Sequence, residues 1–341
     1  MSRAAGWFLS SGIQDASGGV SRYYRGDSGE RLPNSTEITG YAVSGLVWLG
    51  QQEAAKRAAQ FLVSAWDESA GLFPFELNGT SRQAYFFDTG MIARGLLALW
   101  RQTRSAEYRE AARRAGESMI RYFTAAEGYH PILTLPDRTP LAYEPWWSRQ
   151  PGAFQLKAAL AWRELAELTG EEQFEQHYQR LLAFALRSLR MLIDAEPDRL
   201  KVMDRLHPYC YFLEGLLPEA NRYPEVLANG IAEVARRLRQ LRDEFIRSDV
   251  YAQLLRLRLL ADGLGIVALD EPAASEEAER LAEFQLVSSD PWLQGAFAFG
   301  ARRGIVIPHA NPVSTVFAAQ ALAWWSERES GAVPQTWRDL I

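Results

Sequence analysis

The stretch "FDTGMIARGLLALW", residues 87–100, shows the pattern that decides the fold. Its apolar and small residues recur at helical spacing, which predicts a buried α-helix. The stretch nevertheless begins with a carboxylate, Asp88. Five other segments share a polar or turn-forming start followed by a run rich in small and apolar residues. These segments are 35–50, 150–168, 207–220, 249–265 and 311–327.

Amphipathic, charge-rich segments alternate with these six runs. They are 52–66, 107–123, 171–193, 224–246 and 275–287, and a segment near 2–10 supplies a sixth partner. Each has a polar face, as a helix packed between a core and water does. The alternation recurs with a period of very roughly 40–65 residues, in the range of repeat architectures. We therefore predict an all-α (α/α)6 barrel, or toroid, with six apolar inner helices and six amphipathic outer ones.

Glycine-rich connections punctuate the predicted helices. The segments "GGVSRYYRGDSGE" (18–30), "GLFPFELNG" (71–79), "GYHPILTLPD" (128–137) and "LQGAFAFGARRGIVIP" (293–308) are typical of turns between short extended stretches. No long alternation of β-branched residues predicts a large sheet. We expect short β-hairpins in the connecting loops of a single domain covering residues 1–341.

Composition excludes several classes of protein. The net charge is −5 and the arginines are dispersed among acids, which disfavours nucleic-acid binding. The one cysteine, Cys210, rules out an intrachain disulfide and any multi-cysteine zinc site, and its apolar surroundings predict an inert buried thiol. No apolar run predicts a signal peptide or a membrane span, so we expect a cytoplasmic protein away from membranes. No nucleotide-binding or serine-hydrolase motif is present, and we expect neither a cofactor nor a metal. The oligomeric state is left open.

The predicted topology gathers polar groups at one end of the barrel. If one antiparallel outer helix separates successive inner helices, all inner helices run in the same direction and their N-termini meet at one mouth. The residues expected around that concavity are Glu37, Asp88, Trp146, Trp147, Arg149, His207, Asp249 and His309. The alternative role for the polar starts at Thr36, Asp88, Asp249 and Asn311 is N-capping, worth about 1 kcal/mol each.

Four segments carry a resemblance to a known superfamily: "TEITGYAVSGLVWL", "FDTGMIARGLLALW", "HPYCYFLEGLL" and "NPVSTVFAAQAL". They resemble inner-helix starts of six-hairpin glycosidases, in bacterial relatives linked to polysaccharide metabolism. Unsaturated glucuronyl hydrolases, N-acylglucosamine 2-epimerases and glucuronyl C5-epimerase-like proteins share this layout. The resemblance covers nearly the whole chain and implies the toroid fold and a role with carbohydrates. Hydrolysis, elimination, epimerisation and binding alone all remain open.

A hydrolase of this class needs a proton donor with a raised pKa and a second carboxylate. Asp88 is the candidate acid/base, because Phe86 and Phe87 would desolvate it. Glu37 begins the neighbouring inner helix and is its candidate partner. Two further aspartates, Asp204 and Asp249, are alternatives.

A sugar epimerase is the second reading. The resemblance to 2-epimerases implies a catalytic histidine pair, and His207 and His309 are expected at or just before the starts of inner helices four and six. Histidine suits proton abstraction near neutral pH. The 2-epimerase pattern places a Glu one turn after its histidine, whereas Glu214 follows His207 by about two turns.

Substrate binding is assigned to the segment "YEPWWSRQPG" (143–152) and its neighbours. Trp146 and Trp147 could stack on sugar rings, and Arg149 could pair with a carboxylate. Arg82, Tyr85, Arg22 and Asp249 are further candidates. We expect a glycoside hydrolase for uronate-containing oligosaccharides, with an anionic sugar favoured by the arginines. A non-catalytic glycan-binding or polysaccharide-assembly protein is the third alternative, with an aromatic mouth but no acid/base pair.

Overall fold

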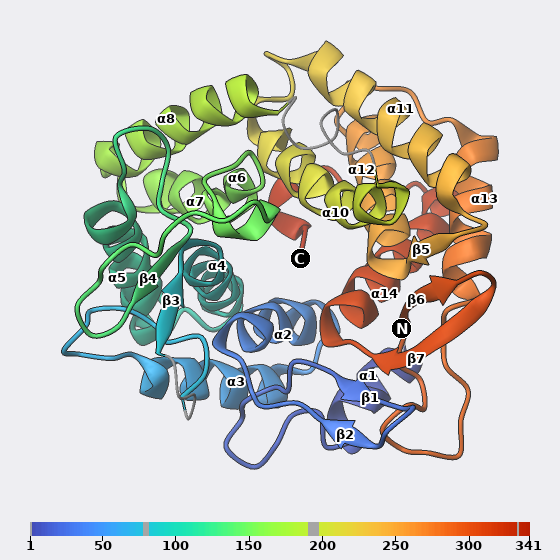
Figure 1. The fold of residues 1–341 in the computed structure, drawn as a ribbon, viewed down its shortest axis with the longest axis horizontal. Coiled ribbons are helices and arrows are strands. Elements are labelled where there is room, and N and C mark those ends of the chain that lie inside the picture. The colour runs from blue at the N-terminus through green and yellow to red at the C-terminus, as the bar shows by residue number, and fades with distance from the viewer. Residues whose placement is uncertain (1, 78–81, 190–197, 333) are drawn as a thin grey trace. The chain divides into compact units, whose positions relative to one another are not determined.

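The computed structural model describes residues 2–77, 82–189, 198–332 and 334–341 and is mainly helical (Figure 1). The chain divides into two compact units, which we describe separately. Unit 1 comprises Met1–Ile13, Tyr23–Arg31 and Ile193–Ile341, and unit 2 comprises Gln14–Arg22 and Leu32–Leu192.

Unit 2 contains three of the predicted helix pairs. Its helices are α2 (Thr36–Trp48), α3 (Gln52–Ala65), α4 (Phe86–Thr103), α5 (Ala106–Phe123), α6 (Gln155–Ala158), α7 (Leu160–Thr169) and α8 (Glu172–Ser188). Strands β3 (Gln83–Tyr85) and β4 (Ile132–Thr134) pair antiparallel, and a 3-10 turn, η1, covers Trp147–Arg149.

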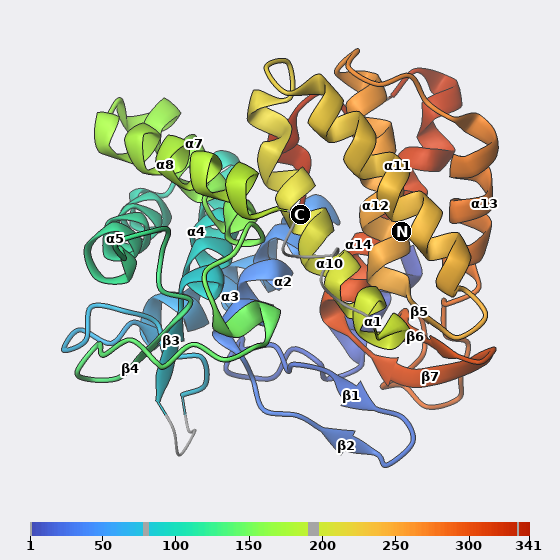
Figure 2. The same cartoon turned by 45° about the horizontal axis from the view of Figure 1, so that its top comes forward.

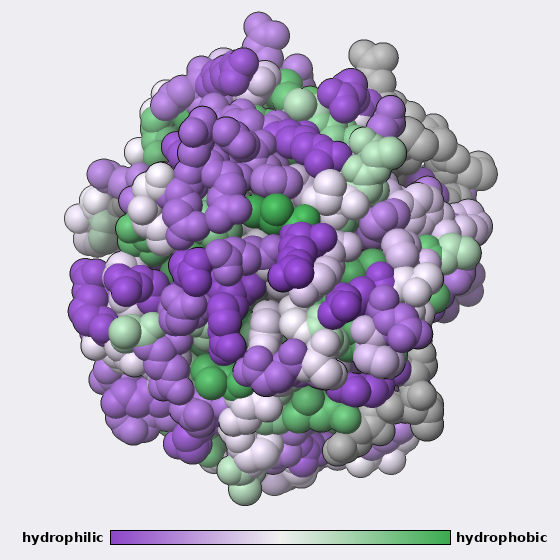
Figure 3. All heavy atoms as spheres, turned by 90° about the vertical axis from the view of Figure 1, so that its left-hand side faces the viewer, coloured by the Kyte–Doolittle hydropathy of each residue, from purple (hydrophilic) through white to green (hydrophobic). Residues whose placement is uncertain are grey.

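The pairing of apolar with amphipathic helices in unit 2 follows the burial of their residues. Fourteen of the eighteen residues of α4 are buried, against eight of the eighteen of α5. The outward face of this unit, which carries α5 and α8, is predominantly hydrophilic, with apolar atoms in small separate areas (Figure 3). Helix α4 therefore packs as an inner helix, and α5 covers it with its apolar stripe.

Unit 1 contains the other three pairs and a sheet. Its helices are α1 (Ser2–Ser10), α10 (Arg199–Leu216), α11 (Pro224–Leu241), α12 (Ser248–Gly263), α13 (Glu271–Ala282) and α14 (Pro312–Glu327), with 3-10 turns η2 (Leu217–Glu219), η3 (Arg328–Ser330) and η4 (Trp337–Asp339). Helix α12 contacts both α10 and α14, and the three helices lie in the same region of unit 1 (Figure 2). Fourteen of the sixteen residues of α12 are buried. Helix α1 packs on α14, as expected for the sixth partner.

Two of the predicted hairpins combine into one small sheet of unit 1. Its strands are β1 (Tyr24–Arg25), β2 (Glu30–Arg31), β5 (Phe245–Arg247), β6 (Ala298–Arg302) and β7 (Ile305–Ala310). They are antiparallel in the order β2-β1-β7-β6-β5, and Tyr24 pairs with Ala310. Hairpin β6–β7 turns through Arg303 and Gly304, both with positive φ (49° and 76°). The segment 128–137 does not form a hairpin of its own, because its strand β4 pairs with β3.

Several helix boundaries differ from the predictions, and α13, expected over 275–287, covers Glu271–Ala282. Helix α10 begins at Arg199, so the start predicted at residue 207 was wrong. The third inner helix is interrupted at Ala159, whose ψ of −8° departs from α-helical values and separates α6 from α7. Helix α8 ends at Ser188, and residues 190–193 of the predicted segment 171–193 lie outside the described residues.

Candidate active site

Close packing of α2 on α4 brings the two candidate carboxylates of unit 2 together. A Cβ on Gly40 would lie 2.9 Å from Ile92 Cα, and a Cβ on Gly95 would lie 2.4 Å from the Gly40 carbonyl oxygen. The same Cβ on Gly95 would lie 3.2 Å from Val43 Cβ. Gly40 thus faces Ile92, and Val43, three residues later on α2, faces Gly95, three residues later on α4. The helices therefore run parallel.

The same register places the N-terminal residues of the two helices. Gly40 faces Ile92, and one turn earlier along both helices lie Glu37 on α2 and Asp88 on α4. The two carboxylates interact electrostatically, because the charge of Glu37 raises the pKa of Asp88. The sequence signal for this approach was the small residues at Gly40 and Gly95.

N-capping explains only part of the recurring polar starts. Ser35, not Thr36, caps α2 by accepting from the Ile38 N–H, and the Thr36 hydroxyl donates to the Pro74 carbonyl at 2.9 Å. Asn311 caps α14 and accepts from two backbone N–H groups, as predicted. Asp88 is the third residue of α4, after Tyr85 at the N-cap position. The capping interpretation is therefore confirmed for Asn311 and wrong for Thr36 and Asp88.

Burial controls the protonation of the Asp88–Glu37 pair. Asp88 is 6% exposed, and within the described ranges its Oδ2 has no hydrogen-bond partner. Burial, followed by the charge of Glu37, raises the pKa of Asp88 well above its usual range, against the effect of its own backbone N–H and of Arg22. Burial also raises the pKa of half-buried Glu37 to about 7, opposed by Arg22. Burial therefore favours the protonated form of both groups, and Asp88 is the more buried of the two.

Arg22 acts electrostatically on both carboxylates. Its Nη1 donates to Glu76 Oε1 at 3.1 Å, and its guanidinium lies 5.2 Å from the centre of the Phe75 ring. The guanidinium is thus already paired with one carboxylate, which limits how far it can lower the pKa values of the buried pair.

Tyr85 links the pair to the aromatic loop. Its hydroxyl donates to Gln83 Oε1 at 2.9 Å. Burial raises the pKa of Tyr85, the charge of Asp88 raises it further, and Arg149 lowers it. Tyr85 therefore lies within electrostatic range of both Asp88 and Arg149.

The loop that holds the two tryptophans presents one exposed ring and one packed ring. Trp146 is 57% exposed. The Trp147 ring lies 5.2 Å from that of Phe154, which lies 5.9 Å from the ring of Phe87, the residue before Asp88. The loop is held by an ion pair of 2.6 Å between Arg149 Nη1 and Glu144 Oε1. Arg82, another candidate for substrate binding, forms its ion pair of 2.5 Å with Asp67.

In unit 1, His207 lies within α10 and not at its start. Pro208 follows it inside the helix. The His207 ring is 7% exposed, and its Nδ1 lies 2.7 Å from Gln253 Oε1 and 3.6 Å from Asp249 Oδ2. Burial lowers the pKa of His207 to about 4, against the opposing effect of Asp249. His207 is therefore neutral at pH 7, with Nδ1–H donating to Gln253.

Asp249 serves as an ion-pair partner and not as a simple cap. Arg247 donates to it through Nε at 3.0 Å and Nη2 at 2.6 Å. Arg247 also lies 3.2 Å from Asp204, a second candidate aspartate. Sequence reasoning did not select Arg247, although its place two residues before Asp249 was a signal.

A buried chain of polar side chains supports His207. Gln253 Nε2 donates to Glu214 Oε2 at 3.5 Å, and Arg256 Nη2 donates to Glu214 Oε1 at 2.7 Å. The side chains of Glu214 and Arg256 are both 0% exposed. Glu214 therefore acts on His207 through Gln253.

His309 has different neighbours. It lies on β7, two residues before the Asn311 cap, close to the position predicted before inner helix six. Its Nε2 is 3.4 Å from Asp27 Oδ2, and its ring stacks on Tyr23 with centroids 5.7 Å apart. The structure thus brings Asp249 to His207, and Asp27 to His309.

Other expectations concern metals, membranes and the cysteine. Among the described residues, no group of three or more His, Cys, Asp and Glu is placed to hold a metal ion. In the same part of the chain, no helix combines the length and the hydropathy needed to span a membrane. Cys210 is buried, as predicted.

Comparisons with known proteins identify the fold. A scan against protein-family models and a search of curated proteins find no match. Among solved structures, a sugar epimerase from a ruminal bacterium is similar over 96% of this chain and 95% of its own, with a TM-score of 0.70 and 11% identity. Cellobiose 2-epimerase from Spirochaeta thermophila matches over 95% and 94%, with a TM-score of 0.67 and 15% identity.

A hydrolase shares the same architecture. An inactive α-1,6-mannanase variant of Salegentibacter sp., in complex with α-1,6-mannotriose, matches over 94% of this chain and 98% of its own, with a TM-score of 0.58 and 10% identity. At these identities the similarity establishes the fold alone, and these structures are carbohydrate-active enzymes of more than one type. The chain therefore has the (α/α)6 toroid fold, as the sequence resemblance implied.

Proposed function

We propose that the protein is a carbohydrate-active enzyme, a glycoside hydrolase that uses Asp88 as proton donor and Glu37 as its carboxylate partner. The observation that carries this proposal is the pair itself. Two carboxylates on adjacent parallel helices both have raised pKa values, and we assign the proton to Asp88, the more buried of the two. Hydrolysis of a glycosidic bond requires this division between an acid and a carboxylate.

Each carboxyl group then has a defined step. Asp88 gives its proton to the glycosidic oxygen as the bond from that oxygen to the anomeric carbon breaks. Glu37, as carboxylate, either accepts a proton from the attacking water or attacks the anomeric carbon itself. Asp88 is left ionised and recovers a proton at the end of the cycle, so protons and charges balance.

The substrate-binding residues support a sugar ligand. The exposed face of Trp146 can stack on the apolar face of a pyranose, and Trp147 reaches the pair through Phe154 and Phe87. Arg22 and Arg149 add positive charge near the pair, and we propose that they favour uronate-containing oligosaccharides over neutral ones.

A sugar epimerase is the second candidate, and one observation favours it. His207 is neutral, with Nδ1 engaged by Gln253, the state in which an imidazole can accept a proton. An epimerase would remove and return a proton beside a carbonyl carbon of the sugar, with no change in mass.

One experiment separates these candidates. The purified protein is incubated with uronate-containing and neutral oligosaccharides, and reducing ends and ¹H NMR spectra are followed. A hydrolase releases reducing ends, and Asp88→Asn stops their release while His207→Asn leaves it. An epimerase converts one sugar into its epimer and shows the reverse dependence on the two variants. Binding without turnover of any substrate would support the glycan-binding alternative and contradict both enzymes.

A further inference from the structure

A pocket on unit 1 lies where hairpin β6–β7 and strand β5 meet the C-terminal ends of α11 and α13. Its volume is about 400 Å³, in the range of sites for small molecules. The lining residues are Arg242, Asp243, Ile246, Tyr251, Arg280, Glu283, Phe284, Ala301, Arg303, Gly304 and Val306. None of them belongs to the Asp88–Glu37 pair or to the His207 network, so the pocket is a separate site.

Tyr251 offers an unused hydrogen-bond donor in this pocket. Its side chain is 5% exposed, and within the described part of the chain its hydroxyl makes no hydrogen bond. Burial, followed by the charge of Glu276, raises the pKa of Tyr251 to about 12, whereas the charges of Arg280 and Arg242 lower it. The hydroxyl oxygen itself is not sealed from solvent, so a ligand that enters the pocket can reach it.

Helix α12 keeps this pocket apart from the His207 network. Asp249 and Gln253, four residues apart, face His207. Tyr251 lies midway between them in sequence, which turns it to the opposite side of the helix. A ligand at Tyr251 therefore does not contact His207.

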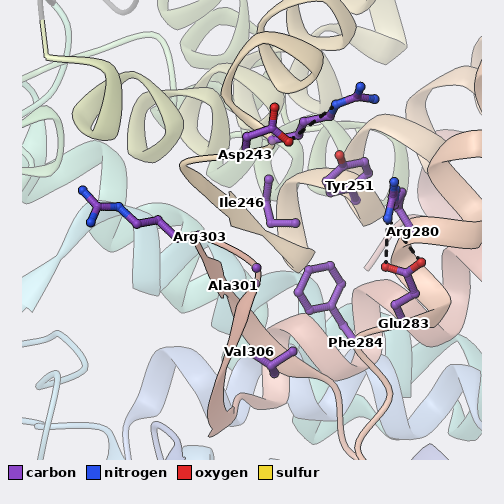
Figure 4. A pocket seen from close by; sticks show the side chains of 11 residues that line it. Asp243, Ile246, Tyr251, Arg280, Glu283, Phe284, Ala301, Arg303 and Val306 are labelled. Atoms are coloured by element: carbon purple, nitrogen blue, oxygen red, sulfur yellow. Dashed lines mark hydrogen bonds and ion pairs between the residues drawn. The ribbon is translucent and has the colours of Figure 1, made fainter.

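The charged rim of the pocket is positive on balance. Arg280 pairs with Glu283 at 3.3 Å, and Arg242 lies 3.5 Å from Glu276, outside the lining, and 3.9 Å from Asp243. Among the described residues, Arg303 has no acidic partner, so the lining carries one excess positive charge. Figure 4 shows Arg303 at one end of the pocket and the Arg280–Glu283 pair at the other. A guanidinium has five N–H donors, so a pairing with one carboxylate leaves donors for a second anion.

The wall between these charged ends is apolar. Ile246 and Phe284 lie between Arg303 and the Arg280–Glu283 pair, and Val306 lies on the nearby strand (Figure 4). Val306 is 41% exposed on its strand. An apolar wall beside arginines and a neutral phenol suits a ligand with both an anionic group and a hydrophobic body.

We propose that this pocket binds a small organic anion, with its carboxylate or phosphate at the Tyr251 hydroxyl and the guanidinium groups of Arg242 and Arg280. The hydrophobic body of the ligand packs on Ile246 and Val306. The proposal does not depend on the reaction assigned to Asp88.

Calorimetric titration of the full chain with matched probes tests the ligand class. Benzoate and phenyl phosphate carry both an anionic head and an apolar body, benzyl alcohol carries the body alone, and acetate carries the head alone. We expect the better of the two aromatic anions to bind at least about tenfold more tightly than benzyl alcohol or acetate, since both parts contribute. Equal binding of benzyl alcohol, or no binding of either aromatic anion at millimolar concentration, overturns the proposal.

Two variants locate the binding at this pocket. Tyr251→Phe removes a hydroxyl that has no protein partner, so the fold stays intact while affinity for the tighter-binding anion falls about tenfold. Arg280→Gln weakens binding by a similar factor and reduces its dependence on salt. Arg236→Gln is the matched control, because Arg236 is also an exposed arginine paired three residues away, with Glu233. If Tyr251→Phe and Arg280→Gln bind the anion as tightly as the control, the site lies elsewhere and the proposal is wrong.

Discussion

At the scale of single residues, Asp88 shows how the packing around a side chain sets its chemistry. A carboxylate near a helix N-terminus is ordinarily stabilised in its charged form. Asp88 lies in the first turn of α4, yet burial and the neighbouring charge of Glu37 raise its pKa. The sequence could indicate desolvation through Phe86 and Phe87, but the closeness of Glu37 depends on the packing of α2 on α4.

The coupling between the two carboxylates is directly measurable. Because the charge of Glu37 raises the pKa of Asp88, Glu37→Gln should lower the pKa of Asp88. We expect the pKa of Asp88 to be clearly lower in the variant than in wild type. Carboxyl ¹³C chemical shifts, followed against pH in both proteins, check this. An unchanged pKa of Asp88 would show that the two groups do not interact.

The raised pKa of Glu37 also makes stability depend on pH. The native state binds the Glu37 proton more tightly than the unfolded chain does. Protonation of Glu37 therefore stabilises the native state fully below the unfolded pKa near 4.5, and this stabilisation is lost as pH rises to about 7. Relative to Glu37→Gln, wild type should therefore lose stability across this window, by up to about 3 kcal/mol. Urea denaturation of both proteins between these pH values provides the measurement. If the unfolding free energies of the two proteins depend on pH in the same way, the prediction is wrong.

At the scale of helices and strands, the close contact of α2 with α4 depends on glycine. A Cβ on Gly95 would meet the Gly40 carbonyl oxygen at 2.4 Å, an approach that requires the backbone to shift. Gly95→Ala should therefore destabilise the protein by about 2–3 kcal/mol and reduce activity, because α2 and α4 must separate. Chemical denaturation and turnover provide the readouts.

Gly6, on α1, is the matched control for this prediction. It is also a helical glycine, but a Cβ there would meet nothing within 4 Å. Gly6→Ala should stabilise the protein by about 0.5–1 kcal/mol, because alanine favours the helix. If Gly95→Ala proves as benign as Gly6→Ala, the close approach of α2 and α4 is not required.

The polar residues at the helix starts have different roles, and the capping role of Asn311 can be tested against Asp88. Asn311 accepts from the Val313 and Ser314 N–H groups at 2.8 and 3.1 Å. Asn311→Ala should cost about 1 kcal/mol of stability, whereas Asp88→Asn should cost little, because Asp88 is not at the N-cap position and an asparagine oxygen can still accept from the residue's own backbone N–H. Thermal unfolding of the two variants distinguishes them. Equal losses of stability in the two variants would indicate that Asp88 also acts as a cap.

The sequence predicted the helix alternation more reliably than the helix starts. Apolar periodicity located both members of each pair, because burial imposes that pattern directly. The start predicted at residue 207 followed the polar or turn-forming starts that recur in the other segments. The structure has Pro208 inside α10, where His207 becomes a buried residue that faces Gln253. The partner of His207 comes from α12, a contact that no local pattern reveals.

At the scale of the whole molecule, the (α/α)6 fold agrees with more than one reaction on sugars. The similar solved structures include both epimerases and a mannanase. The reaction must therefore be argued from the sites, and each unit offers one candidate. In unit 2 it is the carboxylate pair, and in unit 1 it is the neutral histidine.

Incorporation of deuterium from the solvent distinguishes epimerisation from hydrolysis. An epimerase that removes a C–H proton exchanges it with solvent, so its sugar gains deuterium in ²H₂O, whereas hydrolysis leaves the carbon-bound hydrogens in place. We expect reducing-end release without deuterium at carbon. ¹H NMR of the recovered sugars provides the measurement, and deuterium incorporation that depends on His207 would favour the epimerase.

The central claim is that Asp88 donates the proton, and the turnover of Asp88→Asn tests it most directly. Asp137→Asn, at an exposed aspartate of the same unit, is the matched control. The account predicts that Asp88→Asn lowers kcat/KM for oligosaccharide hydrolysis by about 10²–10⁴ while sugar binding and unfolding temperature stay near those of the control. Turnover by Asp88→Asn equal to that of Asp137→Asn would contradict it.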